Sequence, residues 1–334
     1  MARYAVFGNP ILHSKSPQLF SPLLNDQDTY TRIRPQSPED LIRVVKFLNI
    51  IGSSITAPYK ESILPFLDHL TDAAAEVGAV NCIRNDDGRL TGHNTDAFGV
   101  TDALKEAGIN PADSKILVLG AGGAARAAVY GLCKEGAEVF VSNRTSSKAE
   151  ALAKRFGAKA VDWEQPGTLP YFDAIVSALL PEAIPPFIGY ICYGWMLDAV
   201  YKRSEMQRHS LRRGAKIIEG TRWLIYQGIA AAKFYLPGQF SGFNAETIAN
   251  ETFEVAFTEK ASRLTANERA LAKAMEVSLN TVVSKECLSV YALNSKSLSS
   301  FDSGHHDIAI SAFGYNDQTI NKIRNEEIRL AFGD

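Results

Sequence analysis

The sequence predicts an α/β protein with two domains followed by a C-terminal extension. Short apolar runs typical of strands alternate with segments of helical length from residue 4 to about residue 218. Within this region, near residue 120, a glycine-rich turn joins a fully apolar strand to a helix. With 334 residues, 46% of them apolar, the chain is long enough to bury two or three separate cores.

Charge and composition indicate which partners and which cellular compartment are expected. A formal net charge of -2 gives no general attraction to nucleic acid or to an anionic membrane, so neither partner is expected. The four cysteines are widely spaced and form neither a disulfide framework nor a CxxC metal pair, which favours a reducing cytoplasm. The first residues do not resemble a secretory signal, and no run reaches ~18 apolar residues, so a soluble protein is expected.

The first domain is predicted from alternating elements. We expect strands at 4–7, 30–33, 54–56, 79–84 and 89–92, and helices at 17–25, at 38–48, after 60 and from 96. The predicted domain comprises residues 1–97 and 221–258, because a helix at 245–259 would return and pack on it. A cleft is expected between this domain and the next.

The second domain is predicted to be doubly wound around a parallel sheet. Strands are expected at 115–119, 137–142, 174–177 and 216–218, and helices at 146–156 and 223–234. The segment KILVL at 115–119 is apolar throughout, as in strands that are buried on both faces. This domain is expected to span residues 98–220.

The turn after that strand has the pattern of a dinucleotide-binding site. Glycines at 120 and 122 allow the backbone to approach a pyrophosphate, Ala125 permits close helix packing, and the helix N-terminus directs free N–H groups at the phosphates. A Rossmann-like domain is therefore predicted, although a tight turn without a ligand is the alternative. The predicted contacts are Gly120, Gly122, Gly123, Ala124 and Ala125.

The end of the next predicted strand favours NADP. An NAD-binding fold normally places a carboxylate about 20 residues on, whereas this strand is followed by Asn143, Arg144 and Thr145, with Lys148 one turn later. A guanidinium offers a fork of donors to a 2′-phosphate. A solvated basic pair at a helix start is the alternative interpretation.

Polar clusters in the first domain indicate a site for a polyhydroxylated acid. The clusters are GNPILHSKSP at 8–17, SITAPYK at 54–60, GAVN at 78–81 and GHNTD at 92–96. They supply hydroxyls, amides, an ammonium and a carboxylate near predicted strand ends. Taken singly, the serines are more often helix caps, the asparagines turn residues, Lys60 a surface lysine and Asp96 a helix cap.

These motifs, with GAGGAARAA and NRTSSKA, resemble those of the shikimate dehydrogenase family, in the same order over about residues 1–258. The resemblance implies NADP as cofactor and reversible conversion of shikimate to 3-dehydroshikimate, in chorismate and aromatic amino-acid biosynthesis. It implies Lys60 and Asp96 as the catalytic pair. It implies that the substrate is bound by Ser14, Ser16, Thr56, Asn81, Asn94, Tyr201 and Gln227.

The chain departs from the family's pattern near the expected nicotinamide. Residues 177–181 read SALLP where family members usually have a loop like Asn-Ala-Thr-Pro, and Trp223 stands where methionine is common. Ser54 replaces a frequent asparagine. Two alternatives therefore stay open: a paralogue acting on quinate or another cyclic hydroxy acid, and a non-catalytic ligand-binding regulatory module.

Residues 259–334 extend beyond the family's usual end, and their role is unknown. A helix opened by Thr265 would carry Leu271, Met275, Leu279 and Val282 on one face. That face is expected to pack on the parent domain or on a partner subunit, as in a homodimer. The adjacent His305 and His306 do not share a face, so no metal is predicted.

Overall fold

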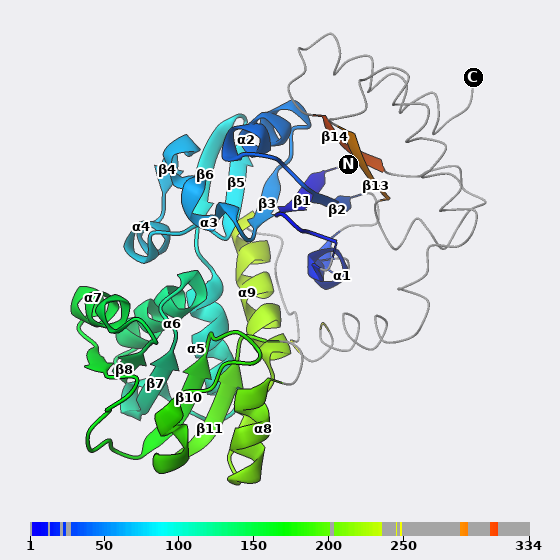
Figure 1. Ribbon diagram of the computed structural model, residues 1–334. Coiled ribbons are helices and arrows are strands. Elements are labelled where there is room, and N and C mark those ends of the chain that lie inside the picture. Colours follow the sequence, from blue (N-terminus) through cyan, green and yellow to red (C-terminus); the bar gives the residue numbers. More distant parts are fainter. Residues whose placement is uncertain are drawn as a thin grey trace, which may run out of the picture. The chain divides into compact units, whose positions relative to one another are not determined.

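The computed structural model describes residues 2–12, 14–20, 23–24, 28–200 and 204–235, the single residues 245 and 248, and the strands 288–292 and 308–312. The chain divides into two compact units, which are residues 1–70, 80–93 and 232–334, and residues 71–79 and 94–231. Each contains a six-stranded sheet (Figure 1). The α/β class predicted from the sequence is confirmed, whereas the domain boundaries stay a prediction.

The first unit is built on a mixed sheet. In spatial order its strands are β2 (Thr29–Ile33), β1 (Arg3–Phe7), β3 (Gly52–Ile55), β5 (Cys82–Asp86), β6 (Arg89–His93) and β4 (His69–Leu70). β1 is parallel to both of its neighbours, whereas β5 is antiparallel to β3 and β6. The β5–β6 hairpin closes through residues 87 and 88, which both have positive φ, as a two-residue turn of this kind requires. The helices are α1 (Ser16–Phe20), α2 (Pro38–Phe47), α3 (Tyr59–Ser62) and the 3-10 turn Leu64–Phe66.

Helix α2 illustrates how local sequence sets an element of this unit. Ser37 precedes it in extended conformation and accepts a hydrogen bond from the Asp40 N–H, with Pro38 as the first helical residue. Leu41, Val44 and Val45 are buried on the side that faces the core. The predicted range, 38–48, is one residue longer than the observed helix.

The second unit contains an entirely parallel sheet. Its strands, in spatial order, are β12 (Lys216–Ile218), β11 (Tyr193–Asp198), β10 (Phe172–Ser177), β7 (Lys115–Leu119), β8 (Glu138–Ser142) and β9 (Lys159–Val161). From β7 the chain adds strands first on one side and then, beginning with β10, on the other. This is the strand order of a doubly wound dinucleotide-binding fold, which reverses between β7 and β10.

Among the described residues, five helices lie in this unit, in chain order α4 (Asp72–Val77), α5 (Asp96–Glu106), α6 (Gly123–Lys134), α7 (Ser146–Phe156) and α8 (Glu205–Arg212). A further helix, α9 (Gly220–Tyr235), begins in this unit and ends in the first unit. Short 3-10 turns occupy Pro111–Asp113 and Pro186–Tyr190. The core between α5, α6 and the sheet includes Val100, Leu104, Ile116 and Val118, all fully buried. The apolar character of β7 thus reflects burial on both faces, as predicted.

Several elements were missed from the sequence. β11 contains tyrosine, glycine and tryptophan, which obscured its apolar pattern, and β4 and β9 are only two and three residues long. Strands β13 (Leu288–Ala292) and β14 (Ile308–Ala312) form an antiparallel pair that was not predicted. The helices predicted at 245–259 and from 265, as well as the two histidines at 305 and 306, lie outside the described residues except for residues 245 and 248.

Neither a membrane span nor a metal cluster is found in the part of the chain that the structure describes. None of its helices is long and apolar enough to cross a bilayer. No group of three histidine, cysteine or acidic side chains among these residues is arranged to hold a metal ion.

One consequence of burial in the first unit can be measured. Burial lowers the pKa of His93 from 6.5 to about 4, and its ring lies 4.9 Å from that of Phe234. The folded chain binds a proton at His93 more weakly than the unfolded chain does. Neutral His93 therefore contributes its full share to the stability of the folded state above pH ~6.5, and this contribution is lost as the pH falls toward 4.

We therefore expect the free energy of unfolding to fall between pH 7 and pH 4.5 by up to ~3 kcal/mol on account of His93. His93→Phe, which keeps an aromatic ring, should flatten the profile, whereas the control His69→Gln on exposed β4 should not. Urea unfolding at several pH values measures this. Parallel profiles for His93→Phe and the unaltered chain would contradict the expectation.

Candidate active site

The loop after β1 carries the two serines predicted to bind substrate. The Arg32 guanidinium holds this loop through the Ser14 carbonyl oxygen, with Nε at 2.9 Å and an Nη at 2.6 Å. The same Nη lies 2.9 Å from Gln18 Oε1. Burial lowers the Arg32 pKa. Arg32 was not predicted to have a role, and its contacts explain how Ser14 is held in place.

The two serine side chains lie together at the start of α1. Ser14 Oγ donates to Ser16 Oγ at 3.1 Å and also accepts from the Ser16 N–H at 3.3 Å. Ser14 is half-buried, and Ser16 is 8% exposed. The structure therefore brings these two predicted residues together as an adjacent pair of hydroxyls.

Three further predicted residues lie around the carboxyl end of β3 in the same unit. Thr56 follows β3, and its N–H donates to the Phe7 carbonyl at 2.9 Å. The Asn81 carbonyl accepts from the Ile55 N–H at 2.7 Å, and the Lys60 carbonyl accepts from the Val80 N–H at 2.7 Å. Asn81 is 4% exposed, whereas Lys60 and Thr56 are half-buried. Backbone hydrogen bonds thus fix the segments that carry a hydroxyl, an amide and an ammonium.

Asn94 and Asp96 open helix α5 in the second unit. The Asn94 Nδ2 donates to the Ala79 carbonyl at 3.0 Å, and its Oδ1 accepts from the Asp96 N–H at 3.1 Å. Asp96 is the first helical residue and is 8% exposed. The first turn of a helix is a favourable position for negative charge, so the carboxylate is electrostatically supported there.

Helix α9 brings Gln227 to the same place. Trp223 donates from its indole Nε1 to the Asp96 carbonyl at 3.0 Å. A Cβ on Gly99 would lie 2.5 Å from Trp223 Cδ1, so only glycine allows α5 and α9 to approach this closely. One turn after Trp223, Gln227 Oε1 accepts from the Thr95 hydroxyl at 3.4 Å. Trp223, which departs from the family's usual methionine, therefore joins the two helices that carry Asp96 and Gln227.

The glycine turn of the second unit lies where the strand order reverses. Gly120 has φ +115°, and its N–H donates to the Ser142 carbonyl at 2.8 Å. A Cβ at this position would lie 3.1 Å from the Ala178 carbonyl oxygen, which follows β10. A side chain is therefore excluded from the point where ligands bind in folds of this order.

Helix α6 begins immediately after this turn and has no side-chain cap. Gly122 is its N-cap, and the first helical hydrogen bond joins the Arg126 N–H to the Gly122 carbonyl at 2.9 Å. The N–H groups of Gly123, Ala124 and Ala125 lie in the first turn, which has no intrahelical acceptors. A Cβ at Gly122 or Gly123 would meet nothing within 4 Å. The open space and the free donors fit a dinucleotide pyrophosphate.

The residues predicted to contact a 2′-phosphate surround the start of α7. Arg144, Thr145 and Lys148 are exposed, and Asn143 Nδ2 donates to the Thr145 carbonyl at 3.0 Å. No acidic side chain of the described residues forms an ion pair with Arg144 or Lys148. Nearby, the buried Ser142 Oγ has no hydrogen-bond partner in the described part of the chain. The residues between β8 and α7 therefore offer positive charge to a ligand, and the end of β8 offers a hydroxyl that has no other partner among the described residues.

A buried carboxylate holds the start of segment 177–181, which departs from the family's pattern. Asp198, at the end of β11, is fully buried and accepts hydrogen bonds from the Ser204 hydroxyl, the Ser177 hydroxyl and the Val200 N–H. Burial raises the Asp198 pKa, and these donors oppose that effect. Tyr201, predicted to contact substrate, lies outside the described residues.

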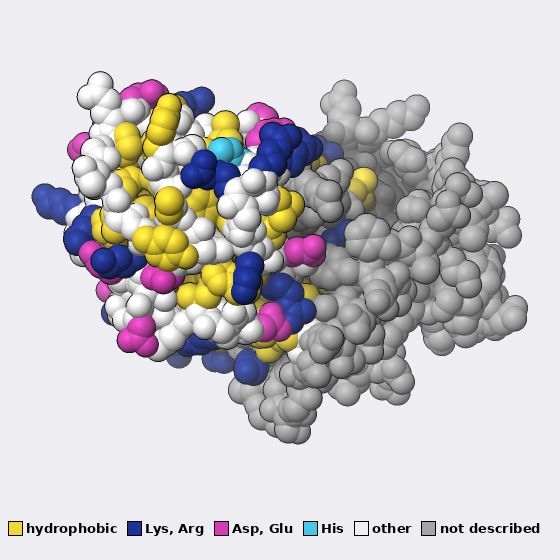
Figure 2. All heavy atoms as spheres, turned by 90° about the horizontal axis from the view of Figure 1, so that it is seen from below, with side chains coloured by type: hydrophobic (Ala, Val, Ile, Leu, Met, Phe, Trp, Pro, Cys, Tyr) yellow, Lys and Arg dark blue, Asp and Glu magenta, His cyan; other side chains and the backbone are white. Residues whose placement is uncertain are grey.

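The charges on the described surface are mixed. On the coloured part of the face in Figure 2, basic and acidic side chains are interspersed with hydrophobic ones. This mixture agrees with a formal net charge of -2. Recognition of a charged ligand therefore depends on local groups such as Arg144 and not on a surface of one sign.

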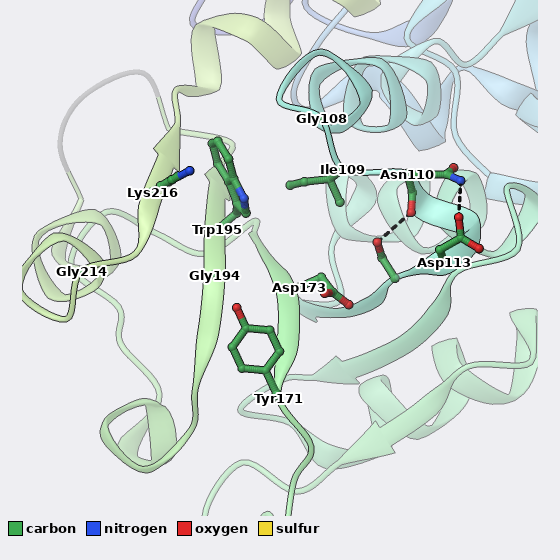
Figure 3. Close-up of a pocket in the computed structure, with 11 residues that line it drawn as sticks. Gly108, Ile109, Asn110, Asp113, Tyr171, Asp173, Gly194, Trp195, Gly214 and Lys216 are labelled. Atoms are coloured by element: carbon green, nitrogen blue, oxygen red, sulfur yellow. Dashed lines mark hydrogen bonds between the residues drawn. The ribbon is translucent and has the colours of Figure 1, made fainter.

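A cavity of the same unit lies at the amino ends of its parallel strands. This cavity of about 440 Å³ is formed where β7, β10, β11 and β12 begin, and Trp195, Tyr171, Asp173 and Lys216 line it (Figure 3). The Lys216 ammonium lies over the Trp195 ring at 4.9 Å. Ligands of doubly wound sheets bind at the carboxyl ends of strands, so this cavity is not the dinucleotide site.

The parallel sheet, the glycine turn at its reversal point and the basic start of α7 define a dinucleotide-binding protein of the Rossmann class. Comparison with protein families identifies the group. Residues 6–83 match the shikimate dehydrogenase substrate binding domain, and residues 102–184 match the shikimate/quinate 5-dehydrogenase domain. The chain belongs to the shikimate dehydrogenase family, which confirms the resemblance seen in its motifs.

Individual relatives support this assignment. The NADP+-dependent shikimate dehydrogenase of Aquifex aeolicus is 35% identical over 243 residues, which is 70% of this chain and 90% of that protein. That of Carboxydothermus hydrogenoformans is 36% identical over 249 residues, 68% of this chain and 88% of the relative. The shikimate 5-dehydrogenase of Thermus thermophilus, solved with NADP(H) and shikimate, has a TM-score of 0.68 at 32% identity, covering 76% and 99% of the two chains.

Proposed function

We propose that this protein is an NADP-dependent shikimate dehydrogenase, which interconverts shikimate and 3-dehydroshikimate in aromatic amino-acid and chorismate biosynthesis. The observation that carries the proposal is the conjunction, in the second unit, of an open glycine turn with the Asn94, Asp96 and Gln227 set. The relatives from Aquifex and Carboxydothermus are named for this activity, and the Thermus structure contains both NADP(H) and shikimate.

The cofactor would supply the hydride acceptor, the nicotinamide ring. The backbone of Gly120, Gly122, Gly123, Ala124 and Ala125 would hold its pyrophosphate at the N-terminus of α6. The 2′-phosphate would be bound by Arg144 and Lys148, with Asn143 and Thr145 shaping the turn between β8 and α7.

The substrate would be held by neutral donors and acceptors. We assign its carboxylate to the Ser14 and Ser16 hydroxyls, which lie side by side. Its ring hydroxyls would bind the side chains of Thr56, Asn81, Asn94 and Gln227, with Tyr201 beside the ring. Amide and hydroxyl groups in buried or half-buried positions suit a polyol, because each can donate and accept.

Oxidation of the alcohol requires that it lose a hydride and a proton. The C–H bond breaks as hydride leaves, and the hydroxyl proton must pass to a base so that the carbonyl forms. We assign the proton transfer to Lys60 and Asp96. The Asp96 backbone is fixed by Asn94 and Trp223, so its carboxylate is pre-positioned to accept or share a proton.

The activity can be tested directly in the full chain. We expect NADPH to appear, by absorbance at 340 nm, when shikimate and NADP+ are supplied, with less product when quinate replaces shikimate or NAD+ replaces NADP+. Turnover of quinate but not shikimate would replace the proposed substrate. Failure with all four combinations would leave only a non-catalytic binder.

Removing either member of the proposed pair should affect turnover more than binding. For Lys60→Met and Asp96→Asn we expect kcat to fall by a factor of roughly 100 to 10,000, with the KM for shikimate changed far less, because proton transfer and not affinity is lost. Steady-state kinetics with shikimate measures both constants. Lys46→Met, on α2, is the matched control for loss of a lysine. A variant that raised KM while keeping kcat would argue against proton transfer.

Arg144 should distinguish the two nicotinamide cofactors. Arg144→Ala removes a charged donor from the 2′-phosphate, so we expect the KM for NADP+ to rise roughly 10- to 100-fold while that for NAD+ barely changes. Lys154→Ala, an exposed basic position near the other end of α7, serves as control. Equal changes for both cofactors would show that Arg144 does not recognise the 2′-phosphate.

Cytoplasmic location and assembly as a homodimer stay predictions from the sequence. Light scattering of the purified full chain measures its mass in solution, which separates a monomer from a homodimer.

A further inference from the structure

A line of hydroxyl groups connects the two loop serines to the interior of the first unit. Ser16 Oγ, which accepts from Ser14 Oγ at 3.1 Å, is also hydrogen bonded to the Tyr30 hydroxyl. Tyr30 donates to Ser54 Oγ at 2.6 Å, and Ser54 Oγ lies 3.1 Å from the Tyr235 hydroxyl. Five hydroxyls from four separate segments of the chain are thereby joined end to end.

The inner part of this line is shielded from water. Tyr30 and Tyr235 are 3% and 2% exposed. The Phe20 ring packs against both, with ring centres 4.5 Å from Tyr30 and 5.8 Å from Tyr235. Burial raises the pKa of both tyrosines, so each keeps its proton throughout the physiological range. The line therefore consists of neutral hydroxyls in a medium where hydrogen bonds reinforce one another.

Proton counting fixes the direction of the outer part of the line, from Ser14 to Ser54, in the free protein. A hydroxyl has one proton to donate, and that of Tyr30 is directed to Ser54. Ser16 must therefore be the donor to Tyr30. Because Ser14 donates to Ser16, the protons point inward, away from the place proposed for substrate.

A carboxylate accepts hydrogen bonds and cannot donate them. Ser14 and Ser16 can bind it only if both turn their protons outward, which leaves the Tyr30 oxygen without its donor. The deficit is met if every hydroxyl rotates together. Tyr235 then donates to Ser54, Ser54 to Tyr30, Tyr30 to Ser16, and Ser16 to the carboxylate. No covalent bond breaks. The Ser16–Tyr30 and Tyr30–Ser54 hydrogen bonds are kept with their polarity reversed, and the Ser14–Ser16 hydrogen bond is exchanged for bonds to the carboxylate.

We propose that Tyr30, Ser54 and Tyr235 form a reversible hydroxyl relay that orients Ser16 toward the substrate carboxylate. The inference rests on the proposed function, since it takes Ser16 as a carboxylate ligand. Tyr30 and Tyr235 act as positioning residues, because they act through Ser16. The relay supplies a donor behind Ser16 when the anion binds, which strengthens the outward hydrogen bond.

The test compares a substrate that carries the negatively charged carboxylate with one that does not. Tyr30→Phe keeps the ring that stacks on Phe20 and removes only the hydroxyl. We expect it to raise the KM for shikimate roughly 5- to 50-fold with kcat within about twofold, because a hydrogen bond behind a charged contact is lost. Tyr235→Phe, at the far end of the line, should give a smaller rise. With shikimate methyl ester, which has no negative charge, kcat/KM should differ less than about twofold between Tyr30→Phe and the unaltered chain.

Tyr193→Phe is the matched control, because it also removes a tyrosine hydroxyl that lies 2.9 Å from a serine Oγ, that of Ser210 in the other unit. It should leave both KM values unchanged. An unchanged KM for shikimate in Tyr30→Phe, or an equal loss for acid and ester, would overturn the relay while leaving the proposed function intact. If the unaltered chain fails to turn over shikimate, the proposed function is rejected and the relay with it.

Discussion

Between β7 and β10 the chain changes the side on which it adds strands, and doubly wound sheets bind their ligands at this reversal point. Backbone groups that would otherwise be covered are left accessible there. The absence of a side chain at Gly120 keeps the position open beside the Ala178 carbonyl, and α6 begins at the same edge with its N–H groups unsatisfied. The cofactor proposal depends on this constraint. Arg144 follows the neighbouring strand β8, and it can bind the 2′-phosphate only if the pyrophosphate of the same dinucleotide lies at Gly120.

A second constraint joins chemistry to packing in the same unit. Trp223 contributes core volume, closes on Gly99 and donates its one N–H to the Asp96 carbonyl. The helix that carries the proposed base and the helix that carries Gln227 are consequently fixed by one side chain. The presence of tryptophan in place of the usual methionine is thus accounted for by a contact that adds a hydrogen bond to the packing.

The fold was largely predictable because buried parallel strands leave continuous apolar runs, as at 115–119, and because Gly120 follows such a run directly. β11 was missed because Tyr193, Gly194 and Trp195 interrupt its pattern. In the site, motif positions such as Asn94 and Asp96 were identifiable, and their adjacency follows from their spacing. The Ser54–Tyr235 contact spans 181 positions and links residues with no shared motif, so only folding reveals it.

The carboxylate end of the proposed site is made of alcohols and phenols whose protonation is constant, and Arg32 directs its donors to the Ser14 carbonyl and Gln18. Anion capture there would consequently be insensitive to acidity over several pH units. Any dependence of the reaction on acidity would then have to come from groups other than those that hold the carboxylate.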